Sequence, residues 1–344
     1  MEAEKPFEKR FPFKLVPTNL PGAYAVPPPP AGFELAKATS AQLRKYGFPF
    51  SRPTARAPSA AIAAWKRATS RKWRVEDWII PELEPVPGKT HHLRDRPSNN
   101  SSPFWSGAVV TGPNGNFNGV LAFWKVPTIS QPTEAQGQRG GWDSSSGAGI
   151  DGWTSNDLLQ AGVQQYIPGP GAKPQYVAWY QWWIAPPTNP PPSPLDPSGY
   201  AEAWVNSTNG TYQYIYQTNF KKFAVAPGDQ VMCAIVYREN AAGTVHFANE
   251  RTGQNVILNL KPPPTVQFAA NNAEWIMELP NGGWPNTSLP KFSQIQFGDA
   301  FATIPNCPSA GLPGNGLILN MLVNGTLVAT ASASGTGVTI NFTG

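Results

Sequence analysis

The chain has 344 residues and a net charge of +5, which is long enough for one large domain and a smaller segment. Proline (39 residues) and glycine (32 residues) are too frequent for a protein dominated by long helices, and a charged fraction of 14% excludes a disordered polyelectrolyte. No apolar run approaches the roughly 20 residues of a membrane-spanning helix, so we expect no membrane span.

The first 30 residues do not resemble a secretory signal, because charges and prolines interrupt them and they contain no apolar core. The signal is absent, already removed from this numbering, or replaced by another export route. We nevertheless expect a secreted or extracellular protein, although no signal peptide is visible.

Charge divides the chain into a segment 1–98 and a domain 99–344. Residues 1–98 carry 17 Lys and Arg against 9 Asp and Glu, whereas residues 99–344 carry 9 against 12. The basic segment is either an arm for nucleic acid or a membrane, or a segment that docks on its own acidic domain. We favour docking, because the basic residues are spread among Pro and Trp and form no dense run. We therefore expect no nucleic-acid or membrane partner, and a monomer.

Within the segment, two short helices precede a linker. Residues 39–47 combine a Thr or Ser N-cap with Gly47 as a stop, and residues 59–73 begin with Ser and alanines, which favour helix. Residues 79–102 are Pro-rich and then polar, which is typical of a linker.

From Trp105 onward the pattern is that of an all-β domain. Short runs rich in aromatic and β-branched residues alternate with turn residues, which indicates a sandwich or a barrel. We expect about eleven strands: 104–110, 118–126, 175–184, 202–206, 212–217, 230–237, 244–250, 255–260, 273–279, 317–323 and 325–332.

Histidine and cysteine are too scarce for most catalytic chemistries. Of three histidines, His91 and His92 lie in the linker, so the domain has only His246, which excludes a three-histidine zinc site there. A Ser-His-Asp triad would depend on His246, which lies in an alternating strand where a packed or surface residue is the commoner finding. Cys233 and Cys307 form one bridge or remain as two buried thiols. We expect no cofactor and no metal.

Carboxylates remain as candidate catalysts. In the strand 273–279 alternate side chains share a face, so Glu274, Ile276 and Glu278 lie together, while Ala273, Trp275 and Met277 face the core. The simple alternative is a solvated face, as in many antiparallel sheets.

The strand 176–183 favours a groove over a solvated face. Trp179, Gln181 and Trp183 share one face of this strand, and Tyr180 and Trp182 share the other. Two tryptophans on an outer face are costly in water unless they line a binding groove. Tryptophan platforms suit sugars and peptides alike.

Six stretches, in this order, resemble the glutamic peptidases called eqolisins, or peptidase family G1. They are "FWSGAVV" (104–110), "GIDGWTSNDLLQAG" (149–162), "YVAWYQWW" (176–183), "APGDQVMCAIVY" (226–237), "ANERTGQ" (248–254) and "NAEWIMEL" (272–279). The resemblance covers about residues 104–300 and leaves residues 1–98 where the family has a removable propeptide.

The resemblance implies a concanavalin A-like β-sandwich of two antiparallel sheets, with a cleft on the concave sheet and a Pro-rich, partly helical N-terminal segment. It implies a catalytic pair at Gln160 and Glu278, the first from "LQAG" and the second from "AEWIME". We expect further substrate contacts from groove residues: Trp105, Asp151, Trp179, Gln181, Trp183 and Glu274.

The sequence departs from the family at two positions. Gly147 stands where the family has a tryptophan, so that Trp142 or Trp153 would have to fill the space, and Gln181 stands where it has a glutamate. The catalytic pair is unaffected. We therefore expect an acid endopeptidase in which the Glu278 carboxylate activates water and the Gln160 amide stabilises the oxyanion, with polypeptide substrates.

Two alternatives remain open for the domain: a carbohydrate- or peptide-binding sandwich, and a peptidase homologue that has lost turnover. Two also remain for residues 1–98. The segment is an inhibitor that is shed, by self-cleavage near residues 91–103, or an extension that wraps the sandwich permanently.

Overall fold

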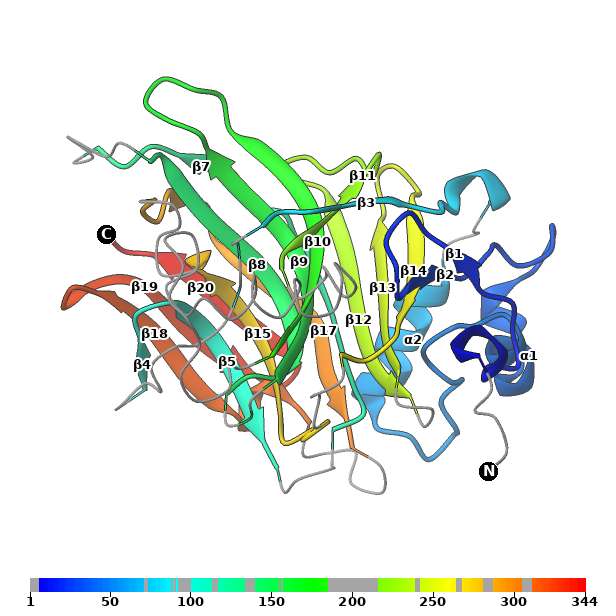
Figure 1. Cartoon of the computed structure of the whole chain (residues 1–344). Helices are drawn as coiled ribbons and strands as arrows, with labels where there is room; N and C mark the ends of the chain where they lie inside the picture. The colour runs from blue at the N-terminus through cyan, green and yellow to red at the C-terminus, as the bar shows by residue number, and fades with distance from the viewer. Residues whose placement is uncertain are drawn as a thin grey trace.

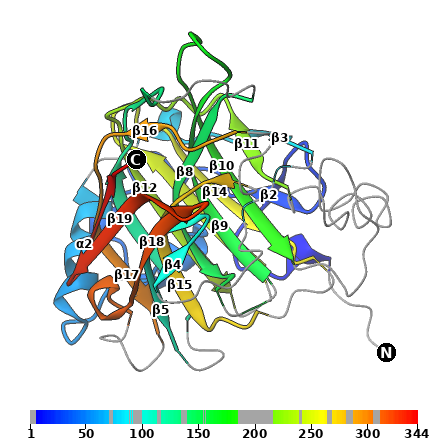
Figure 2. The same ribbon diagram turned by 90° about the vertical axis from the view of Figure 1, so that its left-hand side faces the viewer.

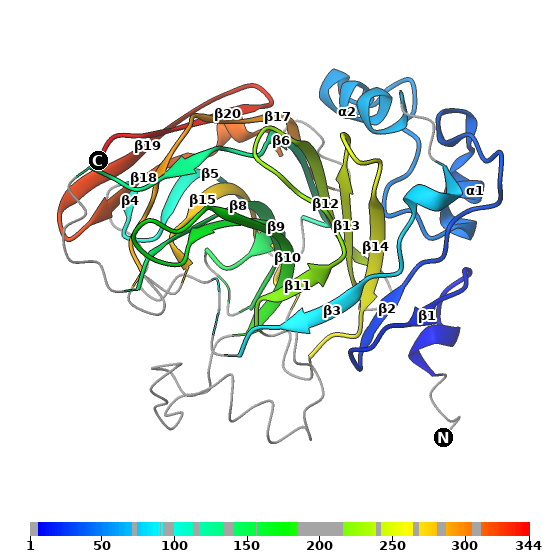
Figure 3. The ribbon, with the colours of Figure 1, turned by 90° about the horizontal axis from the view of Figure 1, so that it is seen from above.

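The computed structural model describes residues 6–70, 74–87, 89, 91, 100–112, 117–133, 140–153, 155, 157–184, 216–238, 242–263, 268–280, 287–304 and 311–344. Strands dominate this part of the chain and form two curved layers that nest as arcs (Figure 3). The predicted β-sandwich is confirmed.

We call the inner arc the groove layer. In spatial order its antiparallel strands are β3 (Glu82–Pro85), β11 (Thr218–Lys221), β10 (Gln175–Ile184), β9 (Asp157–Ile167), β8 (Trp142–Asp151), β15 (Asn272–Glu278), β5 (Trp105–Thr111) and β18 (Leu317–Val323).

We call the outer arc the back layer, and β18 closes it onto the groove layer. Its order is β1 (Val16–Pro17), β2 (Ala23–Ala25), β14 (Asn255–Leu260), β13 (Ala242–Asn249), β12 (Gln230–Arg238), β6 (Gly119–Lys125), β17 (Ile295–Thr303), β20 (Gly337–Phe342), β19 (Thr326–Ser334) and β18. Outside this order, β4 (Ser101–Ser102) pairs with β18 in parallel, and β7 (Ile129–Ser130) pairs with β16 (Lys291–Phe292).

The main core lies between the two layers and follows the period of two in each strand. On β15, Ala273, Trp275 and Met277 point into this core, as the alternation predicts. Glu274 and Glu278 therefore lie on the opposite, concave face of the groove layer.

The basic segment is built into both layers, so the docking alternative is the one that the structure shows. Strand β2 extends the back layer at β14, and β3 crosses over to extend the groove layer at β11 (Figures 1 and 2). Helix α2 (Ser59–Ser70) covers the outer face of the back layer through Ala64 and Ala68, which pack on Phe123 and Met232.

Both predicted helices are present. Helix α1 (Ser40–Lys45) begins with a capping box between Thr39 and Gln42, and Gly47 follows with a φ of 73°, a left-handed conformation that glycine adopts without strain. Helix α2 is the longest helix at 12 residues, and no helix of the described ranges has the length and hydropathy to cross a membrane. The short 3₁₀ turns are Phe7–Lys9, Leu35–Lys37, Val75–Asp77 and Pro313–Asn315.

The prediction of a linker over residues 79–102 is wrong in part. Residues 82–85 form the edge strand β3, with Leu83 buried and its backbone amide and carbonyl both bonded to the Asn19 side chain. Proline is compatible with this position because an edge strand leaves one row of backbone groups unpaired. Beyond β3 the chain turns from the sheet edge onto the concave face.

Several strands, among them two central ones of the groove layer, were not predicted from the sequence. Strand β8 reads "WDSSSGAGID" and lacks the β-branched residues of a typical strand, yet it lies between β9 and β15. Strands β9, β11, β17 and β20 were also not predicted. The predicted strand 202–206 and most of the predicted strand 212–217 lie outside the described residues, and residues 216–217 are not in a strand.

Candidate active site

The two predicted catalytic residues lie on the same concave face, on strands separated by β8. Gln160 on β9 lies opposite Gly149 of β8, and Glu278 on β15 lies opposite Ser145 of β8. Both side chains are almost completely buried, although the face that carries them is not part of the core between the layers. Something else therefore covers them.

The cover is His91, from the N-terminal segment. Its ring nitrogen Nδ1 lies 2.9 Å from Oε2 of Glu278, and Nε2 of Gln160 donates to its backbone carbonyl at 3.0 Å. Its backbone amide donates to Oε1 of Gln181 at 2.7 Å. Gln160 and Glu278 thus converge on one residue of a peptide that lies in the groove.

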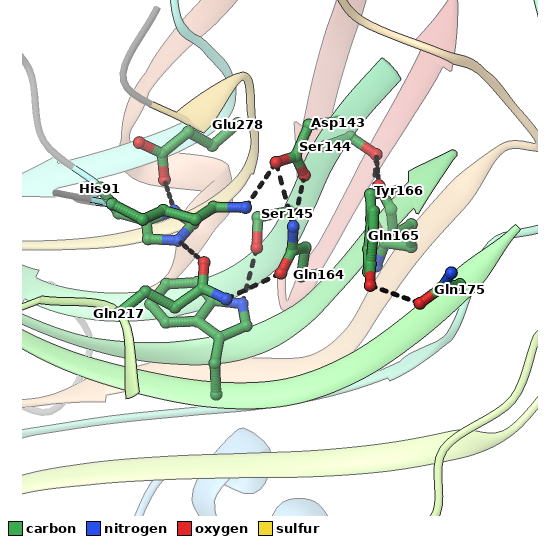
Figure 4. A network of polar contacts seen from close by, with 12 residues as sticks. His91, Asp143, Ser144, Ser145, Gln164, Gln165, Tyr166, Gln175, Gln217 and Glu278 are labelled. Carbon is green, nitrogen blue, oxygen red and sulfur yellow. Dashed lines mark hydrogen bonds and ion pairs between the residues drawn. The ribbon is translucent and has the colours of Figure 1, made fainter. Parts of the chain in front are cut away.

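A chain of polar side chains runs from His91 to a second residue of the segment (Figure 4). Nε2 of His91 lies 2.6 Å from Oε1 of Gln217, whose amide nitrogen donates to Gln164, whose own amide nitrogen donates to Asp143. The chain ends at Asp143, which forms a buried ion pair with Lys89. Burial lowers the pKa of Lys89, and the Asp143 carboxylate opposes this shift.

Trp179 forms the floor under His91. The imidazole stacks on the indole with 3.7 Å between ring centroids and 8° between planes. The indole Nε1 of Trp179 on β10 donates to Oγ of Ser145 on β8, so the indole crosses the intervening strand β9. Gly162 is the cross-strand neighbour of Trp179, and a side chain there would collide with the β8 backbone at Ser146, 2.2 Å away.

An apolar wall flanks the catalytic face. Trp105 lies directly opposite Glu278 across β5 and β15, and Trp183 belongs to the same buried cluster. The other fully buried members of this wall are Val109, Leu158, Ile276 and Leu319. The wall shields one side of Glu278 from bulk solvent, which strengthens electrostatic interactions there.

Three comparisons place this arrangement among known proteins. A scan against protein-family profiles matches residues 103–342 to the peptidase A4 family.

The chain belongs to the peptidase A4 family.

Similarity to curated relatives and solved structures agrees. The chain is 24% identical to aspergillopepsin-2 of Aspergillus niger over 253 residues and to scytalidopepsin B of Scytalidium lignicola over 246 residues. Each alignment covers 69% of this chain and 77% of the relative. A solved structure of scytalido-glutamic peptidase with a transition-state analogue inhibitor shares the fold, with a TM-score of 0.51 and 22% identity over 70% of this chain and 98% of that chain. The predicted eqolisin membership is confirmed, and with it the class of enzyme, a glutamic-type endopeptidase.

The two departures of this A4 peptidase from the family pattern have structural consequences in the groove. Gly147 is the cross-strand neighbour of Gly162, and a side chain at Gly147 would begin 2.6 Å from the Ala161 carbonyl oxygen, so the present strand pairing needs glycine there. Of the two tryptophans considered for the space at Gly147, Trp142 does not fill it, because it is buried in the core between the layers. Trp153 packs against the apolar wall. Gln181 uses its amide oxygen to hold His91.

Glu274 and Asp151 form a second acidic group beside the two predicted catalytic residues of this peptidase. A side chain at Gly149 would begin 2.1 Å from Oε1 of Glu274 and 2.9 Å from Cβ of Gln160, so these two residues are neighbours across a glycine. Burial raises the pKa of Glu274 well above its usual range, and the Asp151 and Glu278 carboxylates add to this. Glu274 is therefore neutral in acid.

Asp151 serves the framework of the site. Its two carboxylate oxygens accept hydrogen bonds from the backbone amides of Ala270 and Asn271, at 2.9 and 3.1 Å, and from the hydroxyl of Tyr237. These contacts hold the start of β15 against β8. The predicted substrate contact at Asp151 remains a proposal, and this geometry favours a positioning role.

Sequence reasoning missed most of the residues that contact the segment. Asp143, Ser145 and Gln164 lie on strands without a strong strand pattern, and Gln217 lies at the end of a predicted strand. Lys89 and His91 fell in the supposed linker. Only the position of His91 near the charge boundary offered a signal.

The groups that sequence reasoning set aside lie away from the groove or outside the described residues. His246 is buried on the outer face of the back layer, bonded to Asn255 and stacked on Phe50, which rules out a role beside Glu278. Cys233 is a buried free thiol, and Cys307 lies outside the described residues. Among the residues that the structure describes, no cluster of His, Cys, Asp and Glu could hold a metal ion.

Asp157, at the start of β9, is expected to make the folded protein more stable in acid than near neutrality. Burial and the Asp151 carboxylate raise its pKa to about 7, and the Phe268 backbone offsets only part of this shift. An unfolded chain releases this proton near pH 4, so the stabilisation is present in full below pH 4 and is lost as the pH rises to about 7.

Asp157→Asn should therefore reduce the fall in unfolding free energy between about pH 4 and 7 by roughly 1.4 kcal/mol per pH unit. Chemical denaturation at a series of pH values measures this slope. Asp229→Asn is the matched control: although burial alone would raise the pKa of Asp229, hydrogen bonds from Arg251 and Asn249 lower it, so its effect falls below that window. Equal slopes for wild type and Asp157→Asn would contradict the assignment.

Proposed function

We propose that this A4 peptidase hydrolyses peptide bonds in acid with Glu278 as the base that activates water and Gln160 as the donor that stabilises the oxyanion. The observation that carries the proposal is their convergence on His91. The Gln160 amide donates to the carbonyl of that residue and the Glu278 carboxylate contacts its side chain. A carbonyl held by an amide donor is the geometry that attack by water requires.

The second oxygen of Glu278 is available for water. Oε1 of Glu278 and Nε1 of the neighbouring Trp105 have no hydrogen-bond partner among the described residues, although both are buried. A buried acceptor beside a buried donor is a suitable site for an ordered water molecule. Water held there loses its proton to Glu278 as its oxygen attacks the carbonyl carbon.

The Gln160 amide then stabilises the negative charge on the carbonyl oxygen, and one such donor is typically worth about 3 kcal/mol. Glu278 returns the proton to the leaving amine as the carbon–nitrogen bond breaks. No covalent intermediate is needed. Because neither an amide nor a carboxylate depends on histidine chemistry, the pair remains competent in acid.

The groove is occupied by a peptide in this structure, which favours a peptidase or peptide binder over a lectin. Backbone groups of Lys89 and His91 are bonded to Gln217, Gln181 and Gln160, so the groove supplies partners for a main chain. A sugar has no such alternation of amide and carbonyl groups.

We propose in addition that residues 1–98 inhibit the enzyme. Lys89 and His91 fill the groove and are bonded to Asp143 and Glu278, so substrate cannot enter while they are bound. In acid the domain 99–344, which carries 12 Asp and Glu, loses negative charge, so its attraction to the basic segment weakens. Because the cytosol is close to neutral, acid-dependent activity would suit an enzyme that acts outside the cell. Its family favours polypeptide substrates.

The proposed chemistry predicts a pH–rate profile with its maximum in acid. Cleavage of a denatured protein, followed by gel or mass spectrometry from pH 2 to 7, should be fast below about pH 5 and slow near neutrality. Activity that first rises above about pH 6 would contradict a carboxylate base and an acid-released inhibitor.

A further inference from the structure

We propose that Glu274 is a positioning residue, whose carboxyl group donates a hydrogen bond to the amide oxygen of Gln160 and so aims the Gln160 amide nitrogen at the carbonyl under attack. The effect on catalysis rests on the proposed function, whereas the contact itself rests on geometry. The mechanism with Glu278 and Gln160 leaves this buried acid without a role.

The proposed pair does not by itself explain an acid optimum. A carboxylate base becomes more ionised as the pH rises, and an amide does not titrate. Inhibition by residues 1–98 slows the enzyme near neutrality only while Lys89 and His91 fill the groove. An enzyme with an open groove therefore needs a further group that works only while it is protonated.

Glu274, Gly149 and Gln160 form one row across three neighbouring strands. Glu274 of β15 lies opposite Gly149 of β8, and Gly149 lies opposite Gln160 of β9. Residues directly opposite one another point to the same face of a sheet, so Glu274 and Gln160 both stand on the concave face with the glycine between them. The glycine leaves two long side chains free to meet over the middle strand.

The Glu274 side chain lies over Gly149. A Cβ at this glycine would be 2.1 Å from Oε1 of Glu274 and 2.9 Å from Cβ of Gln160. Oε1 therefore reaches across the middle strand to the base of the Gln160 side chain. Glu274 is 0% exposed and Gln160 is 3% exposed, so bulk water does not compete for a contact between them.

The partners of Glu274 indicate which of its oxygens carries the proton. Oε2 accepts from the amide nitrogen of Asn272 at 2.9 Å. Oε1 is buried and accepts from no residue that the structure describes. An ionised oxygen in such a place is costly, whereas a protonated one becomes a donor and needs an acceptor.

The acceptor that we assign to this proton is the amide oxygen of Gln160. Nε2 of Gln160 donates to the His91 carbonyl at 3.0 Å, so the oxygen is the end of the amide group that remains for Glu274. A hydrogen bond to that oxygen opposes the flip that would turn it toward the substrate carbonyl. It also polarises the amide, which makes the N–H a stronger donor to the oxyanion.

The charges around Glu274 favour its protonated form. Burial raises the pKa of Glu274 well above its usual range, and the Asp151 carboxylate from β8 raises it further, whereas the amide of Asn272 opposes part of this shift. The Glu278 carboxylate on the same strand adds to the rise. Glu274 therefore holds its proton in acid and releases it as the pH rises.

The other strands around Glu274 do not reverse this preference. On β12 the titratable neighbour is Tyr237, which stays neutral because burial raises its pKa well above the usual range. On β5 the residue opposite Glu274 is Val109, which does not titrate. The acid of β9 is Asp157, whose pKa burial raises to about 7. None of these groups is a cation, so none stabilises an ionised Glu274.

Ionisation of Glu274 reverses its effect on Gln160. A carboxylate can only accept, so it attracts the amide nitrogen of Gln160 instead of the amide oxygen. The carbonyl under attack then loses its donor, and the rate falls as the pH rises. Glu274 thus supplies the group that has to be protonated.

The test uses the opened chain, which is the full chain with Lys89→Ala and His91→Ala. Within it, Glu274→Ala should lower kcat on a peptide about 10- to 100-fold at pH 4 with little change in KM, because a misplaced donor costs rate and not binding. Glu274→Gln should retain most of the kcat, because its amide nitrogen donates to Gln160. An unchanged kcat in Glu274→Ala, or equal losses in both variants, would overturn the proposal.

The pH profile distinguishes positioning from a purely structural role. In the opened chain kcat should fall on the alkaline side of its optimum, and in Glu274→Gln the midpoint of this fall should lie at least about one pH unit higher, because an amide does not ionise. Asp157→Asn is the matched control, the same acid-to-amide change at another buried acid, and it should leave the midpoint in place. Equal midpoints in the opened chain and Glu274→Gln, or an equal shift in Asp157→Asn, would overturn the assignment.

Infrared difference spectroscopy tests the contact without hydrolysis. At pH 5 the opened chain should show a protonated carboxyl band that is absent from Glu274→Gln, and the band should shift in Gln160→Ala, because its hydrogen-bond acceptor is lost. If no variant hydrolyses a peptide, the proposed function fails, but a band that shifts still supports the contact. A band that is missing from the opened chain, or unchanged in Gln160→Ala, would overturn the contact itself.

Discussion

Glu278→Gln is expected to abolish peptide hydrolysis in acid, with a loss of at least about 1,000-fold in kcat, because an amide cannot take a proton from water. Gln160→Ala should lose about 100- to 1,000-fold, the usual effect of removing one oxyanion donor. Both variants are assayed in the chain with Lys89→Ala and His91→Ala, on a denatured protein between pH 3 and 5.

The matched control is Glu250→Gln, the same chemical change at a half-exposed residue that pairs with Arg67 outside the groove. It should retain full activity. Denaturation curves of the variants establish that each one folds. If Glu278→Gln and Gln160→Ala both cleave as fast as the control, the proposed pair does not catalyse the reaction.

Removing the two groove side chains of the segment should activate the full chain. Lys89→Ala with His91→Ala removes two ion pairs and the stacking on Trp179, while the backbone strands β2 and β3 remain docked. We expect the two substitutions to weaken binding of the segment in the groove by about 3 kcal/mol. The groove is then open in a larger fraction of molecules, and the initial rate on an added peptide should rise roughly 100-fold. Initial rates near pH 6, where wild type should be inhibited, measure the effect.

Arg67→Ala is the control for this prediction. Arg67 is another cation of the same segment, and it pairs with Asp299 and Glu250 on the back layer, so its loss weakens docking without opening the groove. It should activate little. If Arg67→Ala activates as strongly as the double variant, or the double variant not at all, Lys89 and His91 do not inhibit.

Mass spectrometry then distinguishes a shed inhibitor from a permanent extension. A chain that remains at 37.1 kDa after incubation at pH 3–4 while it is active would show release without cleavage. A truncated chain whose first residue is 92 would show that activation cuts the bond after His91. Because β2, β3 and α2 also dock on the sandwich, cleavage alone does not release the segment. Its dissociation has to be measured separately.

The framework of the site is also suited to acid. Burial raises the pKa of Asp151, Asp157 and Glu274, so all three favour the protonated state inside the fold. Near neutrality these buried groups tend to ionise, and a buried charge costs stability. In acid the groups are protonated, so this cost is absent. Acid, in which we propose that the enzyme works, is thus also the condition in which these buried acids are best tolerated.

Much of this protein can be predicted from local pattern. Alternation in the strand 273–279 placed Glu274 and Glu278 on the face opposite the core, and the capping box at Thr39 with Gly47 marked helix α1. Composition and the scarcity of histidine excluded most other chemistries. Six ordered motifs were enough to identify the family, and they indicated Gln160 and Glu278 as the pair that we propose to be catalytic.

The tertiary structure alone decided what occupies the groove. Strand β8 reads as a loop because serine and glycine have low strand propensity, yet pairing with β9 and β15 on both sides makes it central. His91 meets Gln160, Gln217 and Glu278 across 69 to 187 residues of chain. Neither spacing nor periodicity carries information at such separations, because these contacts arise only when two distant strands and a segment docked at the sheet edge fold together.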